Sequence, residues 1–506
     1  MLARLLLLGL FGVAQIVPGH ARAGAFHDDV RGWRKAHEKA ILEELDALLR
    51  LPNVATHLPD IEANADRLQA MLEARGLAVR ELSAGPGAPP AIYGELRAEG
   101  ATRTVVYYAH YDGQPVTPAQ WRSAPFAPVM RDGAREVDWR AAPAPLDPEW
   151  RLYARSASDD KASIVAILAA LDALKAAGRA PSVHVKVFLD GEEEQGSPHL
   201  RAILEGNKEL LKADLWLFGD GPVHQTRRPQ LFFGVRGITG VEITVYGPAR
   251  ALHSGHYGNW APNPAALATE LFASMRDPEG RILIPRFDAL VRPLTKGEIR
   301  ALAALPDVET ELRESLALGR TEGSQRLADS LMRPALNVRG IAAGAVGEAA
   351  ANAIPTEARV SLDFRLVPDQ TPADVQQRVE SFLRSRGWTV THELPDLATR
   401  KAAPRLARLE WEEGGYPAQR TDLELPAAQA VIASAERALG QRPVILPMLG
   451  GSLPMSHFAE VFAVPVVGVP IANHDNNQHA AEENLRLQNL WDGIELYAAL
   501  LGDLRW

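Results

Sequence analysis

Apolar residues follow helical spacing at the start of the chain and then form short runs that alternate with helical stretches. From Phe26 to about Gly76 they recur every three or four positions, which predicts helices. The later pattern predicts strands at Thr104–Tyr108, Val183–Leu189 and Leu215–Phe218, and helices at Lys161–Leu174 and Pro198–Leu211. Such alternation is typical of an α/β fold whose strands are covered on both faces.

A different order of elements follows between residues 237 and 412. The predicted order is strand Gly240–Tyr246, helix Pro264–Met275, strand Ala335–Ala342, strand Ala358–Val367, helix Pro372–Arg386 and strand Trp388–Glu393. This β-α-β-β-α-β order is the ferredoxin-like arrangement and predicts a small inserted domain. The α/β pattern then resumes with helix Pro426–Leu439, strands Val444–Leu446 and Val464–Val467, and helix Leu487–Leu501. The first domain is therefore expected to comprise residues 24–236 and 413–506.

The first 23 residues have the pattern of a signal peptide. Arg4 precedes an apolar run from Leu5 to Ala14, and Ala21-Arg22-Ala23 has the small-x-small form of a cleavage site. A membrane anchor is the alternative interpretation, but the run is shorter than the roughly 20 residues needed to span a bilayer. We therefore expect cleavage near Ala23 and a periplasmic or secreted protein.

The composition limits the chemistry that the chain can carry. It contains no cysteine, which excludes disulfides, thiolate nucleophiles and cysteine-ligated zinc, so any metal must be held by His, Asp and Glu. The formal net charge is −9, and loss of the two arginines in residues 1–23 would make it −11. We expect no binding of nucleic acid to so acidic a chain, and no membrane attachment after signal cleavage.

Acids and histidines follow three of the predicted strands. His110 and Asp112 are two residues apart in an extended segment, so both point to one side and the carboxylate can orient the imidazole toward a metal. Four acids lie between Asp190 and Glu194, where they repel each other unless a cation neutralises them. Asp220 follows the third strand in a Gly-Asp-Gly segment, which is otherwise a common turn.

Two further segments complete the set. Asp159 and Asp160 precede the helix from Lys161, where acids are also common as helix caps. His479 lies in the polar segment His474–Asn484 near the C-terminus. Because open α/β sheets bind ligands at the carboxyl ends of their strands, the five segments together predict a metal site there.

These five ordered motifs resemble those of the di-zinc metallopeptidases that include carnosinase-type dipeptidases, glutamate carboxypeptidase, aminoacylase and succinyl-diaminopimelate desuccinylase. The resemblance covers nearly the whole chain after residue 23, and Leu294-Thr295-Lys296 and Asn337–Gly340 are most similar to the carnosinase-type branch. Asp132–Trp150 is an added loop relative to this family. The fold implied is a mixed-sheet α/β catalytic domain with an inserted ferredoxin-like lid or dimerisation domain.

The resemblance implies two zinc ions per subunit, and cobalt and manganese would suit the same oxygen and nitrogen ligands. Asp159 would bridge both metals. One metal would add His110 and Asp220, and the other would add Glu194 and His479.

The resemblance also implies the catalytic residues. Glu193 would be the general base for a water between the two metals, and Asp112 would orient a metal-ligating histidine. His253, in Leu252-His253-Ser254-Gly255, would reach from a partner subunit to stabilise the oxyanion. A homodimer formed through the inserted domain is therefore expected.

The substrate residues implied are Asn337, Arg365, Gly451 and Ser452, which would hold a carboxylate and peptide backbone; a strand-end salt bridge is the other interpretation of Arg365. The expected function is hydrolysis of dipeptides or small peptides next to a free C-terminal carboxylate. Deacylation of N-acyl amino acids is the alternative within this family. A non-catalytic zinc-binding protein is the alternative of another class, although no ligand or base is missing. An aminopeptidase is disfavoured because Arg365 and Ser452 suit a carboxylate.

Overall fold

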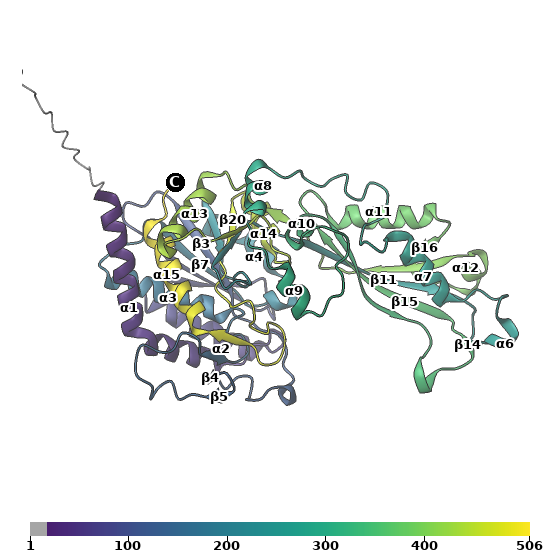
Figure 1. The fold of residues 1–506 in the computed structure, drawn as a ribbon, viewed down its shortest axis with the longest axis horizontal. Coiled ribbons are helices and arrows are strands. Elements are labelled where there is room, and N and C mark those ends of the chain that lie inside the picture. Colours follow the sequence, from purple (N-terminus) through teal and green to yellow (C-terminus); the bar gives the residue numbers. More distant parts are fainter. Residues whose placement is uncertain (1–17) are drawn as a thin grey trace, which may run out of the picture.

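The computed structural model describes residues 18–506. Figure 1 shows a broad lobe built around a large sheet and a narrower lobe that extends away from it. α1 (Pro18–Leu49) lies along the outer side of the broad lobe. Among the described residues, no helix combines the length and apolar character needed to cross a membrane. Most of the predicted signal segment, residues 1–17, lies outside the described residues, so its cleavage stays a prediction.

The large sheet has eight strands and mixed directions. Its order is β1 (Ala78–Leu82), β2 (Ala91–Leu96), β7 (His184–Asp190), β3 (Thr104–His110), β8 (Leu215–Phe218), β20 (Val466–Gly468), β9 (Gln230–Phe232) and β19 (Val444–Leu446). β3 pairs in parallel with β7 and β8, whereas β1 and β2 are antiparallel. The predicted α/β core is confirmed, with several strand boundaries shifted by one or two residues.

Successive residues of the central strands enter different cores, as the alternation of a strand requires. Val105 and Tyr107 of β3 belong to one hydrophobic cluster, and Val106 and Tyr108 to another. The first cluster lies under α1, α2 (Leu58–Glu73), α3 (Lys161–Ala176), α13 (Pro426–Leu439) and α15 (Leu487–Asp503). The second lies under α4 (Leu200–Gly206), α5 (Lys208–Leu211) and α14 (Met455–Phe462). The large sheet is therefore buried on both faces.

The narrower lobe contains a five-stranded sheet with a core of its own. The strand order is β13 (Ala335–Ala342), β15 (Glu357–Leu366), β11 (Gly237–Tyr246), β17 (Leu406–Trp411) and β16 (Thr389–Thr391). α7 (Pro264–Met275) and α11 (Pro372–Ser385) pack on the sheet through a separate hydrophobic cluster. This cluster lies within the predicted range 237–412, while the domain boundaries themselves stay a prediction.

The predicted fourth strand of the ferredoxin-like unit was wrong. β17 is the strand that pairs antiparallel with β11 and completes the arrangement, and no strand was predicted there. The predicted segment Trp388–Glu393 does form β16, but as an extra edge strand parallel to β17. Both segments fit a strand pattern, and pairing with β11 decides which one is central.

A third sheet accounts for part of the added loop. β21 (Asn484–Arg486), β6 (Arg151–Tyr153), β4 (Val129–Asp132) and β5 (Arg135–Glu136) form it in this order. The loop between β4 and β6 buries Trp139 and Leu146, and the N–H of Leu146 donates to Glu38 of α1 at 2.7 Å. Because β21 follows the predicted metal-binding segment His474–Asn484, this sheet supports that segment from outside.

The remaining elements are short. They are β10 (Gly234–Val235), β12 (Leu252–His253), β14 (Ala353–Ile354), β18 (Gln419–Arg420), α6 (Ser254–Tyr257), α8 (Lys296–Ala303), α9 (Glu309–Ser315), α10 (Leu327–Leu331), α12 (Leu397–Ala402) and the 3-10 turns Pro118–Gln120, Glu193–Gln195 and Gly347–Ala349.

Candidate metal centre

Three neighbouring strands deliver acids and a histidine to one edge of the large sheet. β3 ends at His110, β7 ends shortly before Glu193 and Glu194, and β8 ends two residues before Asp220. Because these strands are parallel, their carboxyl ends lie at the same edge. The predicted convergence of these three motifs is therefore a property of the sheet order.

Asp159 lies between two histidines from distant parts of the chain. Its Oδ1 is 2.9 Å from Nε2 of His110, and its Oδ2 is 3.2 Å from Nε2 of His479. The same nitrogen of His479 is 3.2 Å from Oε2 of Glu194. The two oxygens of one carboxylate thus face two separate sets of neighbours.

The candidate ligand atoms form two groups, and within each group the atoms lie within 4.8 Å of one another. The groups are His110, Glu193 and Asp220, and Asp159, Glu194 and His479. All five residues predicted as metal ligands belong to these groups. Glu193, predicted as the base, is the sixth member, so position alone does not separate a base from a ligand.

Asp112 connects the end of β3 with both glutamates. Its Oδ1 accepts the backbone N–H of Glu193 at 3.0 Å, and its Oδ2 accepts that of Glu194 at 3.1 Å. Its Oδ1 also lies 3.3 Å from Nδ1 of His110, the ring nitrogen that faces away from Asp159. Asp112 is fully buried, so it fixes the backbone of the two glutamates and the orientation of the imidazole together.

The electrostatics of the cluster favour bound cations. Burial and neighbouring carboxylates raise the pKa of Glu193 well above its usual range, that of Glu194 to about 8 and that of Asp220 to about 6. Oδ2 of Asp159 is buried and accepts no hydrogen bond, although Nε2 of His479 lies 3.2 Å away. Divalent cations would neutralise these carboxylates and use that oxygen, and the nitrogen and oxygen donors suit zinc, cobalt or manganese. The residues present therefore fit metal ions.

Glu483, which sequence analysis did not single out, holds the turn that contains Asp159. Its Oε1 accepts the backbone N–H groups of Ser158 and Asp159, both at 3.1 Å. Its Oε2 accepts the N–H of Ser156 at 2.9 Å and Nη1 of Arg155 at 2.8 Å. The side chain is fully buried, so these donors replace its water. In the sequence it is only one more acid at the end of the last motif.

The predicted substrate residues come together in a second constellation. Nη1 of Arg365 on β15 donates to Oγ of Ser452 at 2.8 Å, and its Nε donates to Asp363 at 3.2 Å. Asn337 on the neighbouring β13 donates to the same Asp363 at 3.0 Å. Gly451 precedes Ser452 in the loop after β19. About a third of the Arg365 side chain remains exposed, so its guanidinium is accessible to a ligand.

Tyr416 is a second residue that no sequence motif marked. It exchanges two backbone hydrogen bonds of 3.0 Å with Ile238, which is the cross-strand partner of Arg365. Burial and then the charge of Glu193 raise the pKa of the Tyr416 hydroxyl, while the charge of Arg365 opposes the shift. Tyr416 therefore lies within electrostatic range of both the metal cluster and the substrate constellation.

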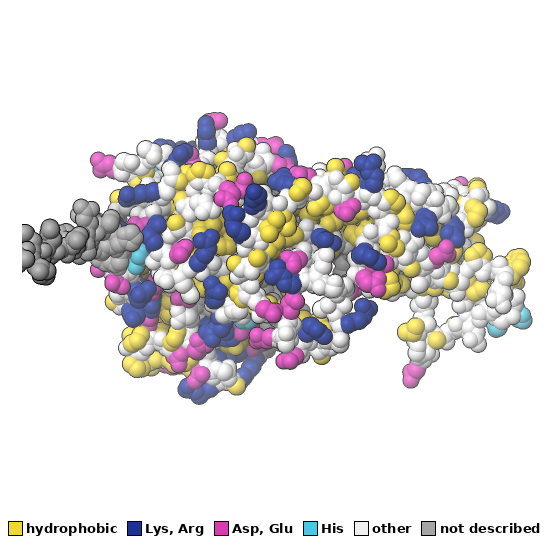
Figure 2. All heavy atoms as spheres, turned by 45° about the horizontal axis from the view of Figure 1, so that its top comes forward, with side chains coloured by type: hydrophobic (Ala, Val, Ile, Leu, Met, Phe, Trp, Pro, Cys, Tyr) yellow, Lys and Arg dark blue, Asp and Glu magenta, His cyan; other side chains and the backbone are white. Residues whose placement is uncertain are grey.

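Within one chain, the structure does not bring His253 to the cluster. His253 ends β12, and Figure 1 places the adjoining α6 and β14 at the far tip of the narrower lobe. Figure 2 shows cyan histidine side chains at the same tip. Nδ1 of His253 accepts the N–H of Gly255 at 3.1 Å, and the residue is exposed.

The acid- and histidine-rich edge of the mixed sheet could hold metal ions, and the family match identifies the class of protein. Residues 106–503 match the model of peptidase family M20/M25/M40, and the chain belongs to this family of metallopeptidases. Among curated relatives, the chain is 25% identical over 468 residues to the Cys-Gly metallodipeptidase dug1 of Schizosaccharomyces pombe, covering 91% of this chain and 92% of that protein. It is 26% identical over 420 residues to the Beta-Ala-His dipeptidase of Homo sapiens, covering 81% and 76%.

Solved structures have a similar fold. The M20 family metallo-carboxypeptidase Sso-CP2 from Sulfolobus solfataricus superposes with a TM-score of 0.74 at 28% identity, covering 91% of this chain and 98% of that one. Human carnosine dipeptidase 1 superposes with a TM-score of 0.73 at 22% identity, covering 95% and 98%, which supports the fold.

Glu483→Gln should reduce bound metal and activity, because an amide would place N–H donors against the backbone N–H groups around Asp159. Leaving one such buried group unsatisfied costs about 1–3 kcal/mol. Elemental analysis would measure the bound metal, peptide hydrolysis the activity, and urea unfolding the loss of stability. Glu460→Gln is the matched control, since Glu460 forms only an exposed pair with Arg201. Unchanged metal content in the Glu483 variant would contradict the role of Glu483 in holding the turn that contains Asp159.

Proposed function

We propose that this metallopeptidase hydrolyses dipeptides or small peptides at the amide bond next to a free C-terminal carboxylate. The observation that carries the proposal is the position of Asp159 between two sets of nitrogen and oxygen donors, with Glu193 and Glu194 beside it. The names of the relatives, a Cys-Gly metallodipeptidase and a Beta-Ala-His dipeptidase, support a small peptide substrate.

In this proposal, two zinc ions occupy the cluster. Asp159 would contact both, His110 and Asp220 would hold one, and Glu194 and His479 would hold the other. Cations held there would supply a more acidic water and polarise the scissile carbonyl.

Glu193 would take the proton of the attacking water and deliver it to the leaving amine. A carboxylate beside metal-bound water can accept a proton and return it to the leaving group. The hydrogen bond from its backbone N–H to Asp112 keeps it in place during both transfers.

Arg365 and Ser452 would hold the free carboxylate of the substrate, while Asn337 and Gly451 would contact its backbone. A guanidinium forms a bidentate, charge-assisted pair with a carboxylate, and the exposed part of Arg365 leaves room for one. N-acyl amino acids also carry a carboxylate next to an amide, so deacylation is the second candidate function.

The proposed active form is a homodimer in which His253 of one chain completes the site of the other. His253 is exposed at the tip of the narrower lobe, far from its own cluster. β13 is an edge strand of the second sheet, with exposed Ile341 at its end, and such an edge can pair with a second copy. Export, motivated by the pattern of residues 1–23, is also part of the proposal.

Glu193→Gln should lower kcat by roughly 100- to 10,000-fold and leave the metal content unchanged, because the base is not a ligand in this proposal. Glu194→Gln should instead lower the metal content. Elemental analysis and kinetics on a dipeptide distinguish the two neighbours, which serve as controls for each other. Loss of metal from the Glu193 variant would make that residue a ligand.

Amidation of the C-terminus of a dipeptide should lower kcat/KM roughly ten- to a hundredfold, because the charge-assisted contacts of Arg365 are lost. In Arg365→Gln the free and amidated dipeptides should be cleaved at similar rates. Arg359→Gln, on the same strand but paired only with Glu357, should keep the wild-type preference. Equal cleavage of both substrates by the wild type would exclude this role of Arg365.

A mixture of inactive His253→Ala and Glu193→Gln chains should regain activity, because one site of a mixed dimer would have its own Glu193 and the partner's intact imidazole. A different affinity tag on each chain would isolate the mixed dimer, and the rate of dipeptide hydrolysis would measure recovery. Verified mixed dimers without activity, or a fully active monomer, would refute the shared site.

A further inference from the structure

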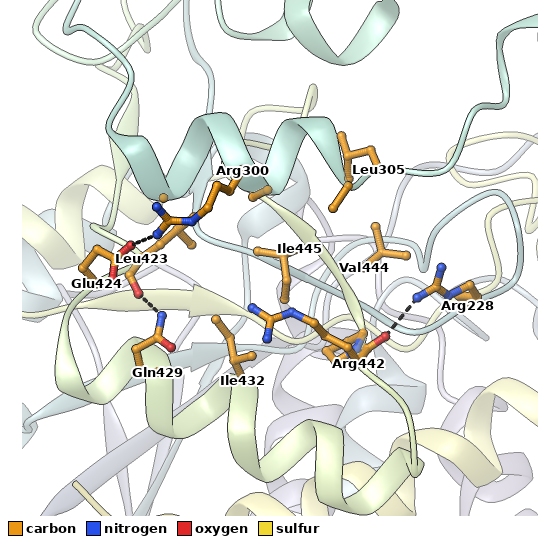
Figure 3. Close-up of a pocket in the computed structure, with 14 residues that line it drawn as sticks. Arg228, Arg300, Leu305, Leu423, Glu424, Gln429, Ile432, Arg442, Val444 and Ile445 are labelled. Carbon is orange, nitrogen blue, oxygen red and sulfur yellow. Dashed lines mark hydrogen bonds and ion pairs between the residues drawn. The ribbon is translucent and has the colours of Figure 1, made fainter.

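A cavity lies between the inserted residues and the rest of the chain. It has a volume of about 380 Å³, within the range of small-molecule sites. Figure 3 shows α8, from residues 237–412, on one side, and α13 and β19 of the broad lobe on the other. None of the residues assigned above to the metal cluster or the substrate constellation lines this cavity.

The floor of the cavity is apolar. Leu423, Ile432, Val444 and Ile445 line it and are buried, and Leu305 contributes from the segment after α8. Such a surface favours an aliphatic group, because contact with it removes apolar surface from water.

The rim carries more positive than negative charge. Arg228, Arg300 and Arg442 line the cavity, and Glu424 is the acid that accompanies them. Arg300 pairs with Glu424 at 2.8 Å, which leaves two guanidinium groups without an acid from the cavity lining.

Those two guanidinium groups are only weakly engaged. Nη2 of Arg228 donates to the backbone carbonyl of Arg442 at 2.9 Å, but its Nε is buried and makes no hydrogen bond. Nη1 of Arg442 lies 3.7 Å from Glu436, and both of these side chains are exposed. In Figure 3 the Arg442 side chain extends between Ile445 above it and Ile432 below it. A charged guanidinium donor beside an apolar surface suits a ligand that has both an anionic group and an apolar chain.

We propose that this cavity is a second ligand site that binds an aliphatic carboxylate of medium chain length. The carboxylate pairs with Arg442, and the hydrocarbon chain lies on Ile432, Val444 and Ile445. Guanidinium groups bind planar carboxylates through paired N–H donors, and desolvation by the apolar floor strengthens that contact. The bound molecule touches both α8 and α13, and so connects the inserted residues with the broad lobe.

Calorimetric titration of octanoate into the full-length protein tests the site. Octanoate should bind the wild type, and Arg442→Gln should weaken binding roughly tenfold or more through loss of a charged hydrogen bond. Ala304→Trp should also block binding, because Ala304 is an exposed residue of the cavity wall. Arg313→Gln, an exposed arginine of α9 outside the cavity, is the matched control and should bind like the wild type.

Two further arms separate this site from others. Octylamine should not bind, because the rim would repel its positive charge. Arg365→Gln should retain octanoate binding. If this variant lost octanoate binding, the ligand would lie in the proposed substrate constellation instead. Unchanged binding in both Arg442→Gln and Ala304→Trp, or equal binding of octylamine, would overturn the proposal. Circular dichroism and dipeptide hydrolysis, both expected to be unchanged in Arg442→Gln, exclude misfolding as the cause of lost binding.

Discussion

Repulsion among buried carboxylates at one edge of the large sheet is the constraint on which the rest of the structure depends. Strand ends and a turn before α3 fix the positions of Asp112, Asp159, Glu193, Glu194 and Asp220. Without cations, burial raises the pKa of Glu193, Glu194 and Asp220, and bound cations would neutralise these carboxylates. Hydrogen bonds from backbone N–H groups to Asp112 and Glu483 fix this arrangement, so a bound metal would meet side chains that are already oriented.

Much of the fold could be predicted because buried strands and amphipathic helices each have a characteristic local pattern of apolar and polar residues. α7, α13, β8, β13 and β19 have the predicted boundaries. The fourth strand of the inserted sheet could not be chosen in this way. Both β16 and β17 have local strand character, but only pairing with β11 over five residues makes β17 central. Pairing between distant segments is a tertiary property that the local pattern does not contain.

The candidate metal site was predictable in part because His110, Glu194 and Asp220 lie at or just after the ends of strands that meet at one edge of the sheet. The positions of Tyr416 and Glu483 could not be predicted, because their neighbours come from distant parts of the chain. Glu483 accepts backbone N–H groups more than 300 residues away in the chain, and any acid could have this pattern of neighbours in the sequence. Tyr416 bonds to Ile238, the cross-strand partner of Arg365, so its position depends on how β11 and β15 pair.

The loop between β20 and β21 carries both His479 and Glu483, and these residues contact Asp159 in different ways. The imidazole faces one carboxylate oxygen, while Glu483 binds the backbone N–H of the same aspartate. The separation of four positions between them therefore fixes the distance between the His479 imidazole and the carboxylate that binds the Asp159 backbone. At Ala480 and Ala481 the number of residues is constrained more tightly than their identity: inserting or deleting one would displace either the imidazole or the carboxylate, and so disturb Asp159 from one side or the other.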